Sequence, residues 1–233
     1  MTRPLLIAHS GFAGTPQNSL ESVAEARSAG ADGVEFDVQC SADGTPVLAH
    51  DSVVVSLRGL ERPISSLPST AISGGAYRVP GATAPPPSLV EVIDRCREAG
   101  LLLNLDVKDL NALPAIRQLI LRVGNTRETF LTGCRVEELS AVGRSVPELS
   151  MLVNVESLDA LDALDAVVLL GAQGINLEHS LAGPEILRAA RRRFLSVGVW
   201  TVDEPDALQR VAQLGVDSVT TNRPTRIGSE RAF

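Results

Sequence analysis

The sequence predicts a TIM barrel, an α/β fold of eight parallel strands alternating with helices, formed as a single domain. Short apolar runs alternate with longer helical patterns from one end of the chain to the other. Several of the helical patterns end at a glycine shortly before the next apolar run, as at Gly100, Gly124 and Gly215. The length of 233 residues also suits one α/β barrel.

Nine runs are strand candidates, although a barrel needs eight. Asp43-Gly44 is a strong hairpin signal, so one of the two runs that it joins should be a short return arm at the barrel mouth. A non-barrel α/β fold is the structural alternative, but the sequence has neither a G-x-G-x-x-G motif nor a P-loop. The nine runs are Leu5–Ala8, Val34–Val38, Val47–Ala49, Leu101–Val107, Thr129–Thr132, Leu149–Val153, Gly174–Leu177, Val197–Val202 and Ser218–Thr221.

Helical patterns fill most of the intervals between these runs. The stretch from Arg58 to Pro87 is different, because it is rich in proline, glycine and serine. Long loops in compact domains are usually functional, so we interpret this stretch as a loop over the barrel mouth, with an ordered linker as the alternative. The expected helices are Leu20–Ala29 behind a Ser19 cap, Ser88–Ala99, Leu113–Val123, Glu137–Val146, Leu158–Leu170, Pro184–Phe194 and Pro205–Leu214.

Charge and cysteine content exclude several classes of function. The formal net charge of −7 gives no basic surface for nucleic acid and disfavours binding to an anionic membrane. Cys40, Cys96 and Cys134 are widely spaced and form no CxxC pair, so they suggest buried thiols in a reducing compartment rather than disulfides or a zinc site. No apolar run reaches the roughly 18 residues of a membrane span, and we expect a cytoplasmic protein.

Polar residues gather at one end of the predicted strands, where the active sites of TIM barrels lie. Glu35 and Asp37 are two residues apart and share one face of their strand, as do Asp106 and its neighbours Asn104 and Lys108. Three converging carboxylates are costly to bury unless their negative charge is compensated, and a bound metal ion is the favoured compensation. Oxygen ligands suit a hard cation, Mg²⁺ or Ca²⁺. The alternative is that Glu35 or Asp37 faces solvent or forms a structural ion pair with Lys108.

Two of the three histidines, His9 and His50, end strand-like runs beside these carboxylates. A single histidine in such a place is usually structural, but a pair supplies the acid and the base that cleavage of a phosphodiester needs near neutral pH. His179 has no such partner, and we interpret it as a residue of the rim. A catalytic triad built on Ser10 is disfavoured, because the sequence has no G-x-S-x-G motif.

The order of these motifs resembles that of the glycerophosphodiester phosphodiesterase family along nearly the whole chain. The resemblance implies that residues 1–233 form one barrel domain of this family. The family's His-Arg-Gly, Glu-Asn-Thr, Glu-x-Asp and His-Asp motifs correspond to segments that begin at His9, Gln17, Glu35 and His50. Downstream, its Pro-Thr-Leu-x-Glu, Asn-x-Glu-x-Lys, Trp-Thr-Val-Asn and Thr-Asp-Arg-Pro motifs correspond to Pro87–Glu91, Asn104–Lys108, Trp200–Asp203 and Thr221–Pro224.

The resemblance implies a metal-dependent hydrolase that converts a small glycerophosphodiester to glycerol 3-phosphate and an alcohol. It implies a divalent cation on Glu35, Asp37 and Asp106, and His9 and His50 as the acid–base pair. Lys108 would act near the phosphate, and Ser10, Trp200 and Arg223 would contact the substrate.

Three residues depart from the family pattern. Ser10 stands where an arginine could grip a phosphate with two charge-assisted hydrogen bonds, so Arg223 or another cation would have to replace it. Asp106 and Gln17 each replace a glutamate. Two alternatives therefore stay open. The barrel could act on another phosphodiester or form a cyclic phosphate, as sphingomyelinase D-like phospholipases do, or it could bind a phosphorylated ligand without catalysis.

Overall fold

The fold is a closed α/β barrel. A computed structural model describes residues 3–142, 146–157 and 160–224. In these ranges, eight parallel strands pair in sequence, and β1 closes the barrel by pairing with both β2 and β12. The prediction of a TIM barrel is confirmed, and a non-barrel fold is excluded. The strands are β1 (Leu5–Ala8), β2 (Gly33–Cys40), β7 (Leu102–Val107), β8 (Thr129–Thr132), β9 (Ser150–Val155), β10 (Gly174–Glu178), β11 (Ser196–Trp200) and β12 (Ser218–Thr221).

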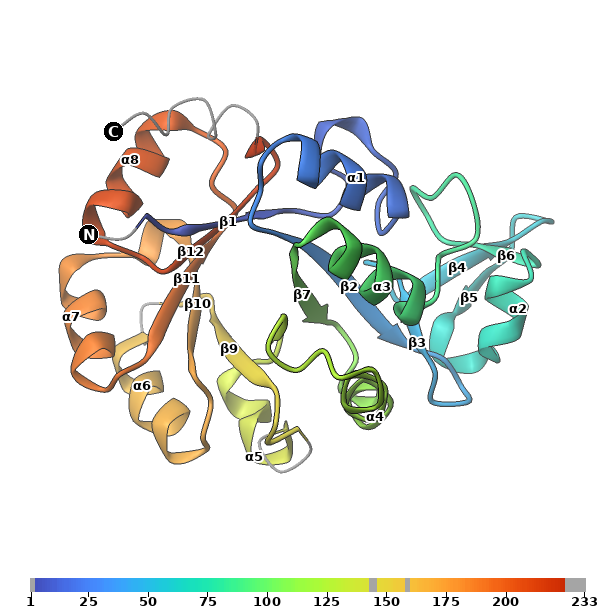
Figure 1. Cartoon of the computed structure of the whole chain (residues 1–233). Coiled ribbons are helices and arrows are strands. Elements are labelled where there is room, and N and C mark those ends of the chain that lie inside the picture. Colours follow the sequence, from blue (N-terminus) through green and yellow to red (C-terminus); the bar gives the residue numbers. More distant parts are fainter. Residues whose placement is uncertain (1–2, 143–145, 158–159, 225–233) are drawn as a thin grey trace.

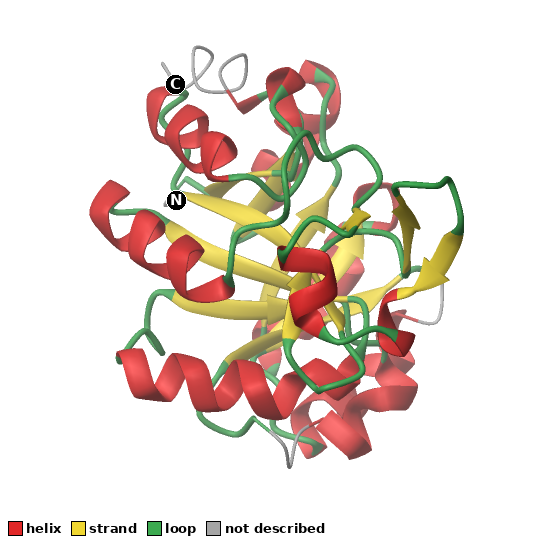
Figure 2. Cartoon of the chain, turned by 90° about the vertical axis from the view of Figure 1, so that its right-hand side faces the viewer, coloured by secondary structure: helices red, strands yellow, loops and turns green. Residues whose placement is uncertain are grey.

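Helices surround the strands on the outside of the barrel (Figures 1 and 2). Their apolar faces and the outer faces of the strands form one continuous buried core. Each fully buried leucine or isoleucine in it contributes about 1.5–3 kcal/mol. The helices are α1 (Leu20–Ser28), α3 (Leu89–Ala99), α4 (Leu113–Val123), α5 (Leu139–Val142), α6 (Ala160–Leu169), α7 (Pro184–Arg192) and α8 (Pro205–Leu214).

The predicted helix signals have the expected geometry. The Ser19 side chain caps α1 by accepting a hydrogen bond from the amide of Ser22. Ser88 and Glu91 form a capping box at the start of α3, and Gly100 ends that helix with a φ of 66°, in the left-handed region. Part of the predicted helix Glu137–Val146 and the start of the predicted helix Leu158–Leu170 lie outside the described residues. Helix α5 begins only at Leu139, after a 3₁₀ turn, Val136–Glu138.

The extra apolar run, Val47–Ala49, is the return arm that the hairpin signal predicts. It forms β3 (Pro46–Leu48), which pairs antiparallel with the end of β2. Figure 1 shows β3 leading from the barrel into the chain segment that carries β4, β5, α2 and β6. The hairpin therefore joins the barrel mouth to a small insertion.

The stretch Arg58–Pro87 is more ordered than the predicted loop. It contributes β5 (Glu61–Pro63), α2 (Ser69–Ser73) and β6 (Tyr77–Arg78), and β4 (Val53–Ser56) pairs with both of these strands. This three-stranded sheet has its own core, separate from that of the barrel, which explains its order. The core consists of Val47, Ala49, Val54, Ile64, Ile72 and Val79.

Candidate active site

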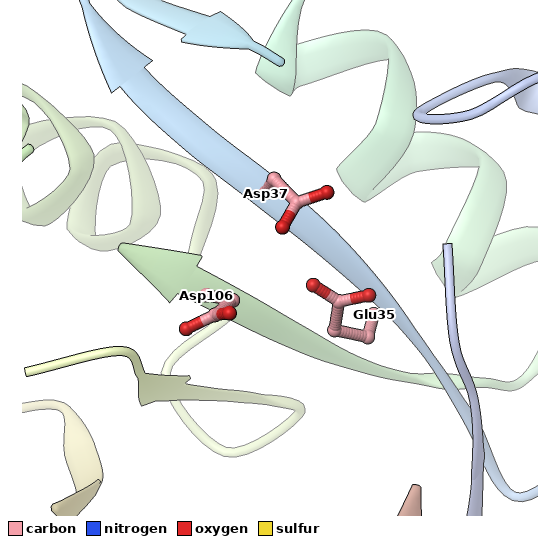
Figure 3. A group of neighbouring side chains, drawn as sticks. All are labelled: Glu35, Asp37 and Asp106. Carbon is pink, nitrogen blue, oxygen red and sulfur yellow. The ribbon is translucent and has the colours of Figure 1, made fainter. Parts of the chain in front are cut away.

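Three carboxylates from two neighbouring barrel strands point toward one another. Glu35 and Asp37 lie on β2 and Asp106 lies on β7 (Figure 3). The parallel register places Asp37 opposite Asp106, and Glu35 lies two residues earlier on the same face of β2. One oxygen of each carboxylate lies within 4.8 Å of the others. Glu35 and Asp37 are only 3% and 2% exposed, so the alternative that they face solvent is wrong.

Hydrogen bonds from the loop after β1 hold two of these carboxylates in place. The amide of Ser10 donates to Oε2 of Glu35 at 2.9 Å. Asn18 clamps Asp37 twice, because its Nδ2 donates to Oδ2 at 3.1 Å and its Oδ1 accepts from the Asp37 amide at 2.8 Å. The Asn18 amide in turn donates to the Ser10 hydroxyl at 2.8 Å. The loop thus fixes the positions of Glu35 and Asp37.

The side chain of Lys108 carries a positive charge next to this cluster. Its Nζ lies 3.2 Å from Oδ1 of Asp37 and 2.5 Å from Oδ2 of Asp106. Burial alone would lower the pKa of Lys108, but Asp106 and Asp37 outweigh it and raise the pKa above its usual value. Burial raises the pKa of Glu35 well above its ordinary range, and repulsion from Asp37 and Asp106 adds to this shift. Lys108 alone therefore does not neutralise the negative charge of the three carboxylates.

The cluster fits a divalent cation. Oε1 of Glu35 is buried and has no hydrogen-bond partner among the described residues, although a buried carboxylate oxygen normally has one. Oxygen donors on three carboxylates match the ligand preference of Mg²⁺ and Ca²⁺. A cation at this point would contact the free oxygen of Glu35 and would offset the negative charge that Lys108 leaves uncompensated.

The two predicted acid–base residues lie near the mouth. His9 directly follows β1, its amide donates to the carbonyl of Thr221 on β12, and its ring Nδ1 is buried without a partner in the described part of the chain. His50 follows β3 and is half exposed, and its Nδ1 lies 2.9 Å from a carboxylate oxygen of Asp51. Gln39 of β2 donates to the His50 carbonyl at 2.9 Å, which attaches the hairpin arm to the barrel.

The predicted substrate-binding residues lie in three different environments. Ser10 is buried among the groups that support the carboxylates. Trp200 ends β11, and its indole N–H is buried without an acceptor among the described residues. Arg223 lies beyond β12, where its guanidinium is 3.2 Å from Glu204. His179 forms a pair with its neighbour Glu178 at 3.5 Å, in agreement with its interpretation as a rim residue.

Several polar residues inside the barrel were not singled out from the sequence. Thr132 on β8 donates to Asn104 at 3.0 Å and lies 3.4 Å from Asp106. Asn154 on β9 accepts hydrogen bonds from the Gly133 amide and from the side chain of Asn176. Polar residues at alternate positions of otherwise apolar strands were the available signal for Thr132, Asn154 and Asn176.

Gly133 is a position where a larger residue should disturb the cluster. Its φ is 90°, and a Cβ atom there would lie 2.3 Å from Oδ1 of Asp106. We expect Gly133→Ala to lower the free energy of unfolding by about 1–3 kcal/mol and to weaken metal binding by displacing Asp106. Thermal unfolding with and without Mg²⁺ or Ca²⁺ measures both effects.

Gly124→Ala is the matched control for this prediction. Gly124 also has a positive φ, 70°, but a Cβ atom there would have no heavy atom within 4 Å. The control should lose stability through backbone strain and keep the full thermal shift on adding metal. An equal metal-dependent shift in both variants would show that Gly133 does not position Asp106.

Comparison with known proteins identifies the family. The model of the glycerophosphoryl diester phosphodiesterase family matches residues 9–226. The chain belongs to this family. It is therefore a phosphoric diester hydrolase, as the resemblance of its motifs implied. The matched region includes each of the carboxylates, histidines and substrate-binding candidates described above.

Named relatives match over most of both chains. A glycerophosphodiester phosphodiesterase of Caldanaerobacter subterraneus subsp. tengcongensis is 23% identical over 232 residues, which cover 95% of each chain. One of Bacillus altitudinis is 25% identical over 237 residues, again 95% of each chain. The similarity to these family members is thus low in identity and nearly complete in extent.

Solved structures share the barrel. The structure of an Oleispira antarctica phosphodiesterase in complex with its product sn-glycerol-3-phosphate has a TM-score of 0.82 at 22% identity, and covers 97% of this chain and 96% of that one. A glycerophosphodiester phosphodiesterase from Parabacteroides distasonis has a TM-score of 0.79 at 23% identity and covers 99% of both chains. At these identities the likeness supports the fold alone. No helix in the described ranges is long and apolar enough to cross a membrane.

Proposed function

We propose that this chain hydrolyses glycerophosphodiesters to glycerol 3-phosphate and an alcohol, with Mg²⁺ or Ca²⁺ bound by Glu35, Asp37 and Asp106. The observation that carries the proposal is the buried carboxylate cluster, whose oxygens lie within 4.8 Å of one another. Membership of the family supports the reaction. The sn-glycerol-3-phosphate bound to the Oleispira antarctica enzyme supports the glycerol part of the substrate.

The proposed roles of the histidines follow from the proton transfers of hydrolysis. A divalent cation held by Glu35, Asp37 and Asp106 would polarise a phosphoryl oxygen and offset its charge. His9 or His50 takes a proton from water as the water oxygen bonds to phosphorus. The other histidine gives a proton to the alcohol oxygen as its bond to phosphorus breaks. One water is consumed, and the two histidines end with their protons exchanged.

The remaining groups would bind and orient the phosphodiester. Lys108 carries a positive charge beside Asp37 and Asp106, where it could pair with a phosphoryl oxygen. The indole N–H of Trp200 lacks an acceptor in the described residues, so it could donate to the substrate. Ser10 is proposed to act mainly through Glu35 and Asn18, because its amide and hydroxyl bond to them. Arg223 would have to leave Glu204 to reach a phosphate.

Metal removal tests the proposal directly. Purified protein should release glycerol 3-phosphate from glycerophosphocholine or glycerophosphoethanolamine, and EDTA should reduce the rate at least about a hundredfold. Adding back excess Mg²⁺ or Ca²⁺ should restore it, and the better of the two identifies the preferred cation. Full activity in EDTA, or no release from any headgroup, would contradict the proposal.

The same samples separate the two alternatives. Phosphorus NMR would show a persistent cyclic phosphate if the barrel catalyses intramolecular transfer instead of hydrolysis. Binding of glycerol 3-phosphate without turnover of any diester would indicate a barrel that has lost catalysis.

The proposed setting is the cytoplasm, with a small molecule as the partner rather than nucleic acid. Cys40, Cys96 and Cys134 are buried free thiols, which fits a reducing compartment. Burial raises the pKa of Cys96 and that of Cys134 to about 12, so both thiols stay protonated and unreactive. The net charge of −7 disfavours a polyanionic partner.

A further inference from the structure

A pocket of about 530 Å³ opens at the ends of β8 and β9. One wall is the turn after β8, which includes Arg135 and Glu137. The other wall is formed by Asn154 to Ser157 at the end of β9 and by Asp162 and Ala163 of α6. Arg135 and Asn154 form an isolated parallel bridge that joins the two walls. The volume lies in the range of small-molecule sites, about 300–1,000 Å³.

Two contacts connect this pocket to the cluster. Gly133 lies against Asp106, since its Cα has no room for a side chain on the side of that carboxylate. The Gly133 amide donates to Oδ1 of Asn154 at 3.3 Å, and Asn154 lines the pocket. A single residue therefore separates the pocket wall from Asp106. A substrate whose phosphate lies at the carboxylates could extend one of its ester arms into the pocket.

Asn154 is oriented by the barrel. Its Oδ1 accepts hydrogen bonds from the Gly133 amide and from Nδ2 of Asn176 at 3.0 Å. Its own Nδ2 has no acceptor among the residues that the structure describes. Because both hydrogen bonds fix the amide plane, Asn154 can offer an N–H donor to a ligand without rearrangement.

The charges that line the pocket are unpaired. Glu137, Glu156 and Asp162 make no ion pair in the described part of the chain, and neither does Arg135. Three carboxylates against one guanidinium leave a net charge of −2, counted over these four lining residues. This charge would attract a cation and would repel a second anionic group.

We propose that this pocket binds the leaving alcohol of the substrate and favours an alcohol that carries an ammonium group. The inference rests on the proposed phosphodiesterase function and adds the class of headgroup to it. The carboxylates of Glu137 and Glu156 attract the ammonium group, and Asn154 donates to a headgroup oxygen. Arg135 limits the preference, because its positive charge opposes the same cation.

Two substrates of similar size test the pocket in the metal-loaded full chain. Glycerophosphoethanolamine has a cationic headgroup and glycerophosphoglycerol has a neutral one. The wild-type ratio of their kcat/KM values should favour the cationic substrate. Glu137→Gln with Glu156→Gln should lower this ratio about tenfold, since each exposed charge changes it by up to about fivefold. Arg135→Gln should change the ratio in the opposite direction and raise it a few-fold.

Glu128→Gln is the matched control. Glu128 is exposed and directly precedes β8, at the opposite end of that strand from the pocket. The Glu128→Gln variant removes one carboxylate and should leave the ratio of the two kcat/KM values unchanged. Equal kcat/KM values for both substrates in the wild type, or an unchanged ratio in the double variant, would overturn the headgroup subsite alone. No hydrolysis of either substrate would overturn the proposed function and the subsite with it.

Discussion

Glu35→Gln is expected to abolish metal-dependent hydrolysis without destabilising the metal-free protein. Activity should fall at least about a hundredfold, because the amide has no negative charge to hold a divalent cation. The fold should tolerate the change, since glutamine has the same shape and its carbonyl oxygen can still accept the 2.9 Å hydrogen bond from Ser10. The free energy of unfolding in EDTA should stay equal or rise, because the variant buries no charge at this position.

The pH dependence of stability provides a second measurement for the same variant. Burial raises the pKa of Glu35 in the folded state, so the metal-free native protein binds this proton more tightly than the unfolded chain does. Stability from this group is therefore present below the unfolded pKa of about 4.3 and is lost as pH rises toward the folded value. The difference in unfolding free energy between variant and wild type, measured in EDTA, should grow in favour of the variant as pH rises.

Glu128→Gln again serves as the control, because it removes an exposed carboxylate away from the cluster. It should keep full activity and the full thermal shift on adding metal. If Glu35→Gln retained either property, Glu35 would not be a metal ligand.

The strands and the carboxylate cluster could be predicted because both follow from short-range rules. Parallel strands buried on both faces appear as apolar runs, and the period of two residues places Glu35 and Asp37 on one face. The pairing of Asp37 with Asp106 follows once β2 and β7 are neighbours in the barrel. Asp43-Gly44 likewise predicted the return arm that is β3.

The insertion could not be predicted in the same way. Its strands have two to four residues, too few for a periodic pattern, and its core joins residues as far apart as Val47 and Val79. Proline, glycine and serine therefore dominated the local signal and indicated a loop. The order comes from tertiary contacts between segments that are individually uninformative.

The supporting residues of the site were hidden for a related reason. Nothing local shows that Asn18 clamps Asp37, 19 positions away, or that Gly133 must lack a side chain because Asp106 occupies the space. Arg223 stays a candidate for a phosphate ligand, and only the structure shows that Glu204 lies 3.2 Å from its guanidinium. Such roles depend on which neighbours the fold brings together rather than on residue type.

His9→Ala and His50→Ala should each reduce hydrolysis of glycerophosphoethanolamine by about 10²–10⁴-fold, the usual contribution of a general acid or base. Both changes should leave the thermal shift on adding metal intact, because neither histidine belongs to the carboxylate cluster. The structure shows that their rings differ in environment, since Nδ1 of His9 is buried without a partner among the described residues whereas that of His50 lies beside Asp51.

A substrate with 4-nitrophenol as the leaving alcohol assigns the two roles. Nitrophenolate leaves without protonation, so the variant that lacks the general acid should lose much less activity on this substrate than on the natural diester. The variant that lacks the general base should lose activity on both substrates, because activation of water is still required. Equal losses on both substrates for both variants would contradict a division into acid and base. Wild-type rates in either variant would remove that histidine from the mechanism.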